Sequence, residues 1–288
     1  MNFFVRFYYL FKAQWFVWSH IMNRDARSLM RAYPPVLDKL QKRIVQDVER
    51  VGIAVTSLEE LFPSESYLKM YQKYIAELPE EAGQQNKKSF LRHYWTTNVA
   101  LAASNPFLQF ALNPRILSIT NTYMGMWTRL KHYTVNRAIP DLEHGNPTFS
   151  QKWHRDPQEK RMIKAFIYLS DVNEDTGPFT YITESTHGKK YGALFPQKPP
   201  LGSYPPAEEV EKKIDPKNIR VMTGKAGTVL FCDTTGIHRG GFVRKGERLM
   251  FTSFYPAPSY VDTVWYSTPP EFDYSSYTRE AVFALHHS

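Results

Sequence analysis

The chain has 288 residues, of which 42% are hydrophobic and 15% aromatic, enough for a substantial buried core in one large domain. The formal net charge is +8, but the first 50 residues hold nine of the basic and only four of the acidic residues. This concentration of charge argues against a nucleic-acid footprint across the fold. The single cysteine, Cys232, excludes an internal disulfide framework and indicates a reducing, cytoplasmic compartment.

The aromatic N-terminal segment, residues 1–30, begins with the most apolar stretch of the chain. Within residues 2–22, Arg6 and Lys12 interrupt the apolar run, so no uncharged stretch reaches the roughly 18 residues that a membrane span needs. No small-residue cleavage site follows, which disfavours a secretory signal. Two alternatives stay open for residues 1–22: peripheral contact with a membrane surface, or packing against the body of the protein or a second subunit.

A helical layer is expected over residues 31–125. Apolar residues recur at helical spacing between Pro34 and Val51, which predicts an amphipathic helix. A short strand is expected at 52–55, followed by a helix that begins at Leu58 behind a capping box of Ser57 and Glu60. Further helices are expected at 64–78 and, from the Asn-Pro pairs at 105 and 113, up to about residue 124.

The pattern changes after Gly125. Short runs rich in β-branched and aromatic residues, separated by Gly, Pro, Asn and Asp, are typical of antiparallel strands. They lie at 128–137, 149–154, 163–169, 179–183, 219–222, 227–232 and 249–255. We therefore expect a mainly β fold with flanking helices: a double-stranded β-helix, or cupin-like jelly-roll core, of about residues 126–256, packed by the N-terminal helices within a single domain of residues 31–288.

Three residues indicate a metal site. His154 and Asp156 are two positions apart, so in an extended segment their side chains lie on one face, and a distant strand or loop can bring His238 to them. Two imidazoles and one carboxylate on one side of a metal form the facial triad of non-haem Fe(II) oxygenases. The His-x-Asp pair alone carries little weight, because this composition produces it roughly 0.3 times by chance.

The surrounding motifs resemble those of the phytanoyl-CoA dioxygenase family of Fe(II)/2-oxoglutarate oxygenases. The resemblance covers about residues 128–256 and is carried by Trp153-His154-Arg155-Asp156, by the strand and Gly-Pro turn of 167–179, and by 226–238 with Arg248 ten positions further on. At 184–187 the chain departs from the family, since it has Glu-Ser-Thr-His where members commonly have Pro-Gly-Ser-His.

The resemblance implies an enzyme that uses Fe(II), 2-oxoglutarate and O2 to hydroxylate an unactivated C–H bond of a small-molecule, acyl-type or lipid-like substrate, with succinate and CO2 as co-products. It implies that His154, Asp156 and His238 bind the metal. It also implies that Asn136 contacts 2-oxoglutarate, and His132 faces the same way along the strand. Asp156 favours hydroxylation over halogenation, because halogenating relatives carry a small residue in its place.

Arg248 suits the co-substrate on physical grounds as well. 2-Oxoglutarate is a dianion that chelates iron at one end and needs a fixed cation at the other. Arginine offers a planar fork of two parallel hydrogen bonds and keeps its charge. Arg248 opens the strand predicted at 249–255, which would place it beside the metal residues, and Thr252 lies on the same face.

Several residues near the site have roles that the sequence leaves open. Arg155 and Arg239 would meet an anionic substrate or face solvent, Lys164 would line the pocket or serve the structure, and His187 would support the site or contact substrate. The proline-rich stretch 184–218 falls between the two halves of the metal site, and we interpret it as a lid.

Two rival functions follow from the same residues. A binding or scaffold protein that kept the jelly roll would be expected to have lost one of the three metal residues or Arg248, and all four are present. A nucleic-acid demethylase would need positive charge near the site, whereas the charge lies at the N-terminal end; we expect no nucleic-acid partner. The substrate and the oligomeric state do not follow from the sequence.

Overall fold

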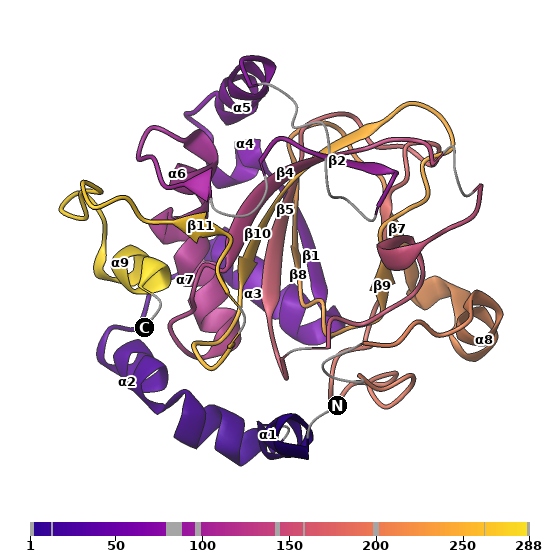
Figure 1. Cartoon of the computed structure of the whole chain (residues 1–288), viewed down its shortest axis with the longest axis horizontal. Coiled ribbons are helices and arrows are strands. Elements are labelled where there is room, and N and C mark those ends of the chain that lie inside the picture. Colours follow the sequence, from indigo (N-terminus) through magenta and orange to yellow (C-terminus); the bar gives the residue numbers. More distant parts are fainter. Residues whose placement is uncertain are drawn as a thin grey trace.

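Two antiparallel sheets form the centre of the computed structural model (Figure 1). The model describes residues 3–12, 14–78, 88–95, 99–141, 145–157, 159–197, 202–261 and 263–286. The larger sheet has the strand order β1 (Ile53–Ser57), β8 (Thr228–Cys232), β5 (Ile163–Tyr168), β10 (Arg248–Tyr255), β4 (His132–Ala138) and β2 (Leu91–His93). The smaller sheet has the order β7 (Ile219–Met222), β6 (Phe179–Ile182) and β9 (His238–Arg239).

The two sheets enclose a hydrophobic layer. Phe166 and Leu230 of the larger sheet pack with Phe179 and Tyr181 of the smaller one, in a cluster that also contains Cys232. Cys232 is fully buried, as expected for a small apolar residue. The expected mainly β core with flanking helices is confirmed, with the sheets arranged as a double-stranded β-helix.

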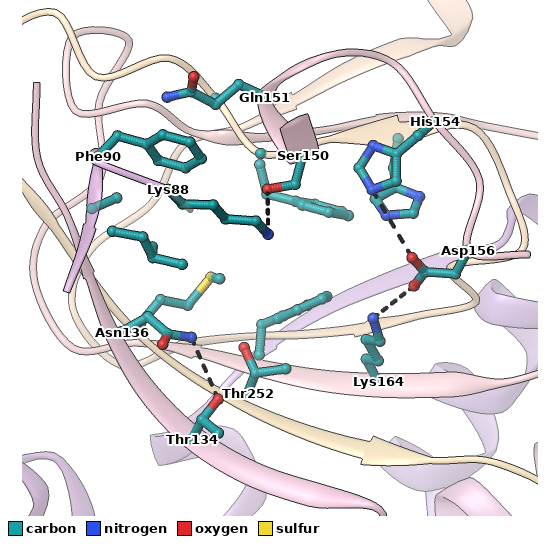
Figure 2. A pocket seen from close by; sticks show the side chains of 18 of the residues that line it. Lys88, Phe90, Thr134, Asn136, Ser150, Gln151, His154, Asp156, Lys164 and Thr252 are labelled. Atoms are coloured by element: carbon teal, nitrogen blue, oxygen red, sulfur yellow. Dashed lines mark hydrogen bonds and ion pairs between the residues drawn. The ribbon is translucent and has the colours of Figure 1, made fainter. Parts of the chain in front are cut away.

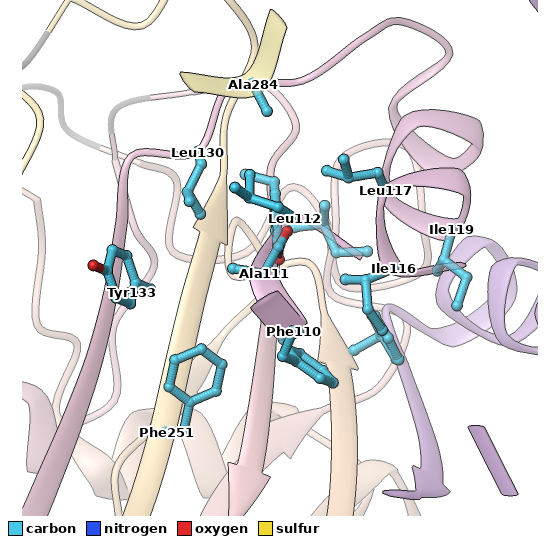
Figure 3. Packing of buried hydrophobic residues seen from close by; sticks show 14 of the residues in the cluster. Phe110, Ala111, Leu112, Ile116, Leu117, Ile119, Leu130, Tyr133, Phe251 and Ala284 are labelled. Atoms are coloured by element: carbon cyan, nitrogen blue, oxygen red, sulfur yellow. Dashed lines mark hydrogen bonds between the residues drawn. The ribbon is translucent and has the colours of Figure 1, made fainter. Parts of the chain in front are cut away.

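Helices cover the outer face of the larger sheet. The covering helices are α3 (Lys39–Val51), α4 (Leu58–Leu61), α5 (Tyr67–Ala76), α6 (Pro106–Ala111), α7 (Pro114–Met124) and α9 (Arg279–Leu285). Figure 3 shows side chains of α6 and α7, among them Phe110 and Ile116, beside Phe251 of β10 and Tyr133 of β4. These helices begin where the sequence predicts, because Asn105 and the asparagine before α7 accept hydrogen bonds from the first backbone N–H groups.

Strand alternation determines which side chains face the space between the two sheets. Tyr133 and Phe251 face the helices, so their neighbours Thr134 and Thr252 face the opposite way, toward the smaller sheet. The threonines at these inward positions present hydroxyl groups to the space between the sheets. The same alternation that builds the hydrophobic core therefore lines a polar cavity.

One predicted strand is wrong in part. Residues 149–151 form a 3-10 turn instead of a strand, and His154 forms only an isolated bridge. The turn is stabilised locally, since the Gln151 side chain accepts a hydrogen bond from the backbone N–H of Thr148 while the Gln151 N–H bonds back to the Thr148 carbonyl. Such side chain–backbone bonds compete with strand pairing. The short pair β3 (Val99–Ala100) and β11 (Tyr266–Ser267), and helix α8 (Ala207–Lys213), also escaped prediction.

The N-terminal segment packs on the body of the protein. It contains α1 (Phe3–Lys12), a π-helical turn (Val17–Met22) and α2 (Arg24–Ala32). The Lys12 amine lies 2.5 Å from one carboxylate oxygen of Glu159, and the Trp18 indole N–H donates to the other oxygen at 2.7 Å. All three side chains are buried. Within the described part of the chain, no helix is long and apolar enough to cross a membrane.

We predict that Lys12→Met destabilises the protein by about 3–5 kcal/mol, because it leaves a buried carboxylate without its cation. Burial already raises the pKa of Glu159, against the opposing effect of Lys12. A carboxyl group with a raised pKa in the folded state favours folding below its unfolded pKa, and this contribution is lost as pH rises. The decrease in the free energy of unfolding caused by Lys12→Met should therefore be larger at pH 7.5 than near pH 5, as measured by urea unfolding.

The matched control for this variant is Lys39→Met, which removes the same charge from an exposed position on α3 and should cost less than about 0.5 kcal/mol. If Lys12→Met lowers the free energy of unfolding no more than the control does, or by the same amount at both pH values, the ion pair does not stabilise the fold as proposed.

Candidate functional site

The triad of His154, Asp156 and His238 comes together at one end of the space between the sheets. One ligand atom from each residue lies within 4.8 Å of the other two. His154 and His238 exchange two backbone hydrogen bonds of 2.9 Å each, and the N–H of Asp156 bonds to the carbonyl of Thr234 at 3.0 Å. Main-chain pairing between distant segments thus aligns the three side chains.

Hydrogen bonds set the ring nitrogen that each histidine presents. His154 Nδ1 lies 2.8 Å from the Lys152 carbonyl, and His238 Nδ1 lies 2.9 Å from the Gly236 carbonyl. Because a carbonyl only accepts, each Nδ1 carries the hydrogen and each Nε2 keeps a free lone pair. Burial lowers the pKa of His154 and lowers that of His238 to about 3, so both rings are neutral near pH 7.

Asp156 contributes one oxygen to this cluster. Its Oδ2 is held by the Lys164 amine at 2.6 Å, while Oδ1 lies 4.0 Å from His154 Nε2 (Figure 2). Burial, the largest single effect, raises the pKa of Asp156, but the charge and hydrogen bond of Lys164 together with the two neighbouring imidazoles outweigh it, and the pKa lies below its usual range. The group is therefore a carboxylate with one oxygen directed at the imidazoles. The expectation that Lys164 lines the pocket is confirmed.

A cavity of about 400 Å³ opens beside the triad. Its walls include every residue that the sequence assigns to the site: the triad itself, Arg248, Thr252, Asn136 and His132. Sequence reasoning did not find Lys88, Ser150, Gln151 and Tyr204, which also line it. Lys88 lies at the start of the segment leading to β2, more than 60 positions before Ser150 and His154 in the chain. The residues around it in the sequence therefore give no sign that it lines this pocket.

Arg248 enters the cavity from the first position of β10. It is only 6% exposed; its Nη1 donates to the Gly177 carbonyl, and its Nε has no hydrogen-bond partner in the described part of the chain. Among the described residues, no Asp or Glu forms an ion pair with it. Burial lowers the pKa of Arg248, yet an arginine with this environment stays charged. The cavity thus contains a buried cation whose charge the described protein side chains do not balance.

The neighbours of Arg248 add further polar atoms. Asn136 on β4 donates to Thr134 Oγ1 at 3.4 Å, while its own Oδ1 is buried and has no partner among the residues that the structure describes. His132 stacks on Trp265, with ring centroids 4.4 Å apart, and no described residue bonds to its Nδ1. Burial lowers the pKa of His132 well below its usual value, so the ring is neutral. This wall can accept or donate hydrogen bonds to a polar ligand.

Arg155 takes neither of the two roles expected from the sequence. Arg155 is among the residues that border the cavity, but strand alternation turns its side chain to the opposite side of the backbone from those of His154 and Asp156. The side chain is buried and donates to backbone carbonyls of Ser185, Tyr191, Leu194, Phe195 and Thr235. Arg155 therefore attaches the segment after β6 to the segment that carries the triad.

Two other candidates lie outside the cavity lining. The guanidinium of Arg239 stacks over the Trp153 ring at 4.2 Å, and His187 is exposed. From the stretch 184–218, residues 202–204 line the cavity, and the Tyr204 ring lies 5.8 Å from the His154 ring. Much of the remaining stretch packs against Trp153, through Tyr191, Val210 and Ile214.

The chain is similar to several solved structures. It matches the epimerase SnoN of nogalamycin biosynthesis, in complex with Fe3+, alpha-ketoglutarate and nogalamycin RO, with a TM-score of 0.55 and 15% identity over 75% of this chain and 83% of that one. It matches HygX from Streptomyces hygroscopicus, with nickel and 2-oxoglutarate bound, with a TM-score of 0.52 and 16% identity over 80% of this chain and 90% of that one. It matches EctD from S. alaskensis, with bound Fe, with a TM-score of 0.52 and 19% identity over 82% of this chain and 83% of that one. The chain shares their fold.

The sequence comparisons give no match. A scan against protein-family models finds none, and neither does a search of curated proteins. At 15–19% identity the structural likeness establishes the double-stranded β-helix and its flanking helices. The phytanoyl-CoA dioxygenase family, which residues 128–256 resemble, is not among the matched family models.

Proposed function

We propose that this protein is an Fe(II)- and 2-oxoglutarate-dependent dioxygenase that hydroxylates an unactivated C–H bond of a small-molecule, acyl-type or lipid-like substrate. One observation carries the proposal: buried Arg248, unpaired with any described carboxylate, lines the same cavity as the triad. Support also comes from the solved structures of this fold, which include proteins with Fe or nickel and 2-oxoglutarate bound.

The donor set of the triad suits Fe(II). Two neutral imidazole nitrogens and one carboxylate oxygen lie within 4.8 Å of one another, close enough for one metal ion to bind all three, and this is the donor set of the facial triad. The Nδ1–H groups of both histidines are fixed by backbone carbonyls, so the rings cannot turn without losing those bonds. Lys164 holds Asp156 Oδ2, which leaves Oδ1 for the metal.

The rest of the cavity suits 2-oxoglutarate. The fork of Arg248 would take the carboxylate of the co-substrate that lies far from the metal. Thr252, Asn136 and His132 line the wall beside Arg248 and would hydrogen-bond to the same molecule. With both groups bound, the centre would use O2 to hydroxylate the substrate, one oxygen atom going to the new hydroxyl group and the other to succinate, with release of CO2.

The chain's own part in this reaction is to orient the reactants and limit the entry of water. The rings of Phe166 and Phe179 line the cavity, and Phe179 lies 5.6 Å from the His238 ring. We propose that residues 184–218 act as a lid, with Tyr204 at its edge beside His154. In this proposal residues 31–288 form one dioxygenase domain.

We predict that Arg248→Met weakens binding of 2-oxoglutarate by at least about tenfold, because a charge-assisted, bidentate contact is lost. Arg239→Met removes the same group from the ring of Trp153, outside the cavity lining, and should leave this affinity unchanged. Both affinities can be measured by anaerobic calorimetry on protein loaded with Fe(II). Wild-type protein exposed to O2 should also release succinate slowly without substrate.

A non-catalytic jelly-roll binding or scaffold protein is the alternative. It would neither bind 2-oxoglutarate in an Fe(II)-dependent manner nor release succinate. Absence of both in the wild-type protein would rule out the dioxygenase.

We also propose that residues 1–22 contact the surface of an anionic membrane. Although Lys12 and Trp18 tie this segment to the body, its outer face carries large apolar side chains that are 46–66% exposed: Phe7, Leu10, Phe11, Trp15, Phe16 and Ile21. Exposed Arg24 and Arg31 follow on α2. Aromatic side chains beside arginines are typical of segments that lie in a lipid interface.

We predict that the protein sediments with phosphatidylserine-containing vesicles and that the double variant Trp15→Ser/Phe16→Ser loses most of this binding. Val36→Ser, at an exposed apolar position outside the segment, should bind as the wild type does. Equal sedimentation with purely phosphatidylcholine vesicles, or no effect of the double variant, would contradict the membrane contact.

A further inference from the structure

Besides Arg248, a second basic group without a carboxylate partner among the described residues lies in the cavity. The Lys88 side chain extends into the cavity and its amine lies 3.3 Å from Ser150 Oγ (Figure 2). No Asp or Glu of the described residues forms an ion pair with Lys88. Burial lowers the pKa of Lys88, and the nearby charge of Lys164 acts in the same direction. An amine in this position needs an anion to offset the cost of burial.

The charges in the cavity do not balance even when iron and co-substrate are counted. Of the four basic residues that border it, Arg155 donates to backbone carbonyls and Lys164 is matched by Asp156. An Fe(II) ion and a 2-oxoglutarate dianion would bring no net charge. Arg248 and Lys88 then remain in excess, and only Arg248 has an expected place on the co-substrate.

The wall around Lys88 is built from hydrogen-bond donors. Ser150 Oγ accepts from Lys88, so its own O–H remains available to donate. The neighbouring Gln151 is 2% exposed, and its Nε2 has no partner among the described residues. Both residues belong to the 3-10 turn that opens with Phe149 at φ 44°, a conformation that costs energy for a residue other than glycine. Strained backbone of this kind often occurs at ligand sites.

We propose that Lys88 and Ser150 form an anion subsite that binds a carboxylate or phosphate group of the substrate. This inference rests on the proposed function, and it narrows the substrate to molecules with an acidic group at one end. The Lys88 amine would hold that group across the cavity while the C–H bond to be hydroxylated faces the triad. Ser150 would add one hydrogen bond to the same group.

The experiment uses protein loaded with Ni(II) and 2-oxoglutarate, in which binding can be measured by calorimetry without turnover. Acetate and inorganic phosphate serve as probes for the two sources of the anion, with acetamide as the neutral control. We expect saturable binding of at least one anion and none of acetamide. Lys88→Met should weaken binding of that anion by at least about tenfold and change the affinity for 2-oxoglutarate less than twofold.

Two further variants keep the test specific. Lys189→Met removes an exposed lysine outside the cavity lining and should leave anion binding unchanged. Ser150→Ala keeps the charge of Lys88 and should weaken anion binding less than Lys88→Met does. Thermal unfolding of each variant establishes that it is folded, and a Lys88→Met protein that does not fold is replaced by Lys88→Gln.

The outcomes separate the subsite from the function on which it rests. If the wild type fails to bind 2-oxoglutarate, the proposed function fails. If it binds 2-oxoglutarate but neither anion, the proposed subsite is wrong. The subsite is also wrong if Lys88→Met weakens the binding of 2-oxoglutarate and leaves the binding of the anion unchanged. In the last case Lys88 would belong to the co-substrate.

Discussion

The candidate site depends on the backbone bridge between His154 and His238. These residues lie 84 positions apart, and their two mutual hydrogen bonds of 2.9 Å align the segment before β5 with the short strand β9. The bridge places the two rings with centroids 4.2 Å apart, and the extended backbone after His154 brings Asp156 to the same point. Side-chain bonds then fix the ring orientation, since both Nδ1 groups face carbonyls. The fold therefore determines the position of the three donors, and local bonds determine which atoms they present.

Charge is the second constraint on this cavity. Asp156 is the only carboxylate among the described residues that line it, and Lys164 already pairs with one of its oxygens. Arg248 and Lys88 remain without a carboxylate partner. Buried charges without partners are costly, so such an arrangement is consistent with ligands that bring the missing negative charge. Both proposals, the co-substrate on Arg248 and the acidic group of the substrate on Lys88, follow from this imbalance.

Local patterns in the sequence were sufficient for most of the central strands and the helices that cover them. Short runs rich in β-branched and aromatic residues located β4, β5 and β10, and the Asn-Pro pairs located α6 and α7, because these signals arise from contacts within a few residues. The residues of the site were harder to predict from the sequence. His154, Asp156, His238 and Arg248 were found through their motifs, whereas Lys88 reaches the cavity only through tertiary packing that no local pattern encodes.

Other features of the structure also could not be, or were not, predicted from the sequence. The Lys12–Glu159 and Trp18–Glu159 contacts join positions 147 and 141 apart, so no local pattern predicts them. For Arg155 a signal was present and was not used: the alternation that groups His154 with Asp156 also turns Arg155 away from them. The turn at 149–151 escaped prediction because Thr148 and Gln151 bond locally in a segment whose composition favours a strand.

The most direct test of the central claim is a crystal structure of the protein grown anaerobically with Mn(II) and 2-oxoglutarate. We predict an anomalous scattering peak within coordination distance of His154 Nε2, Asp156 Oδ1 and His238 Nε2. We also predict density for 2-oxoglutarate that joins this peak to the guanidinium of Arg248. A metal bound elsewhere, or 2-oxoglutarate without contact to Arg248, would contradict the account.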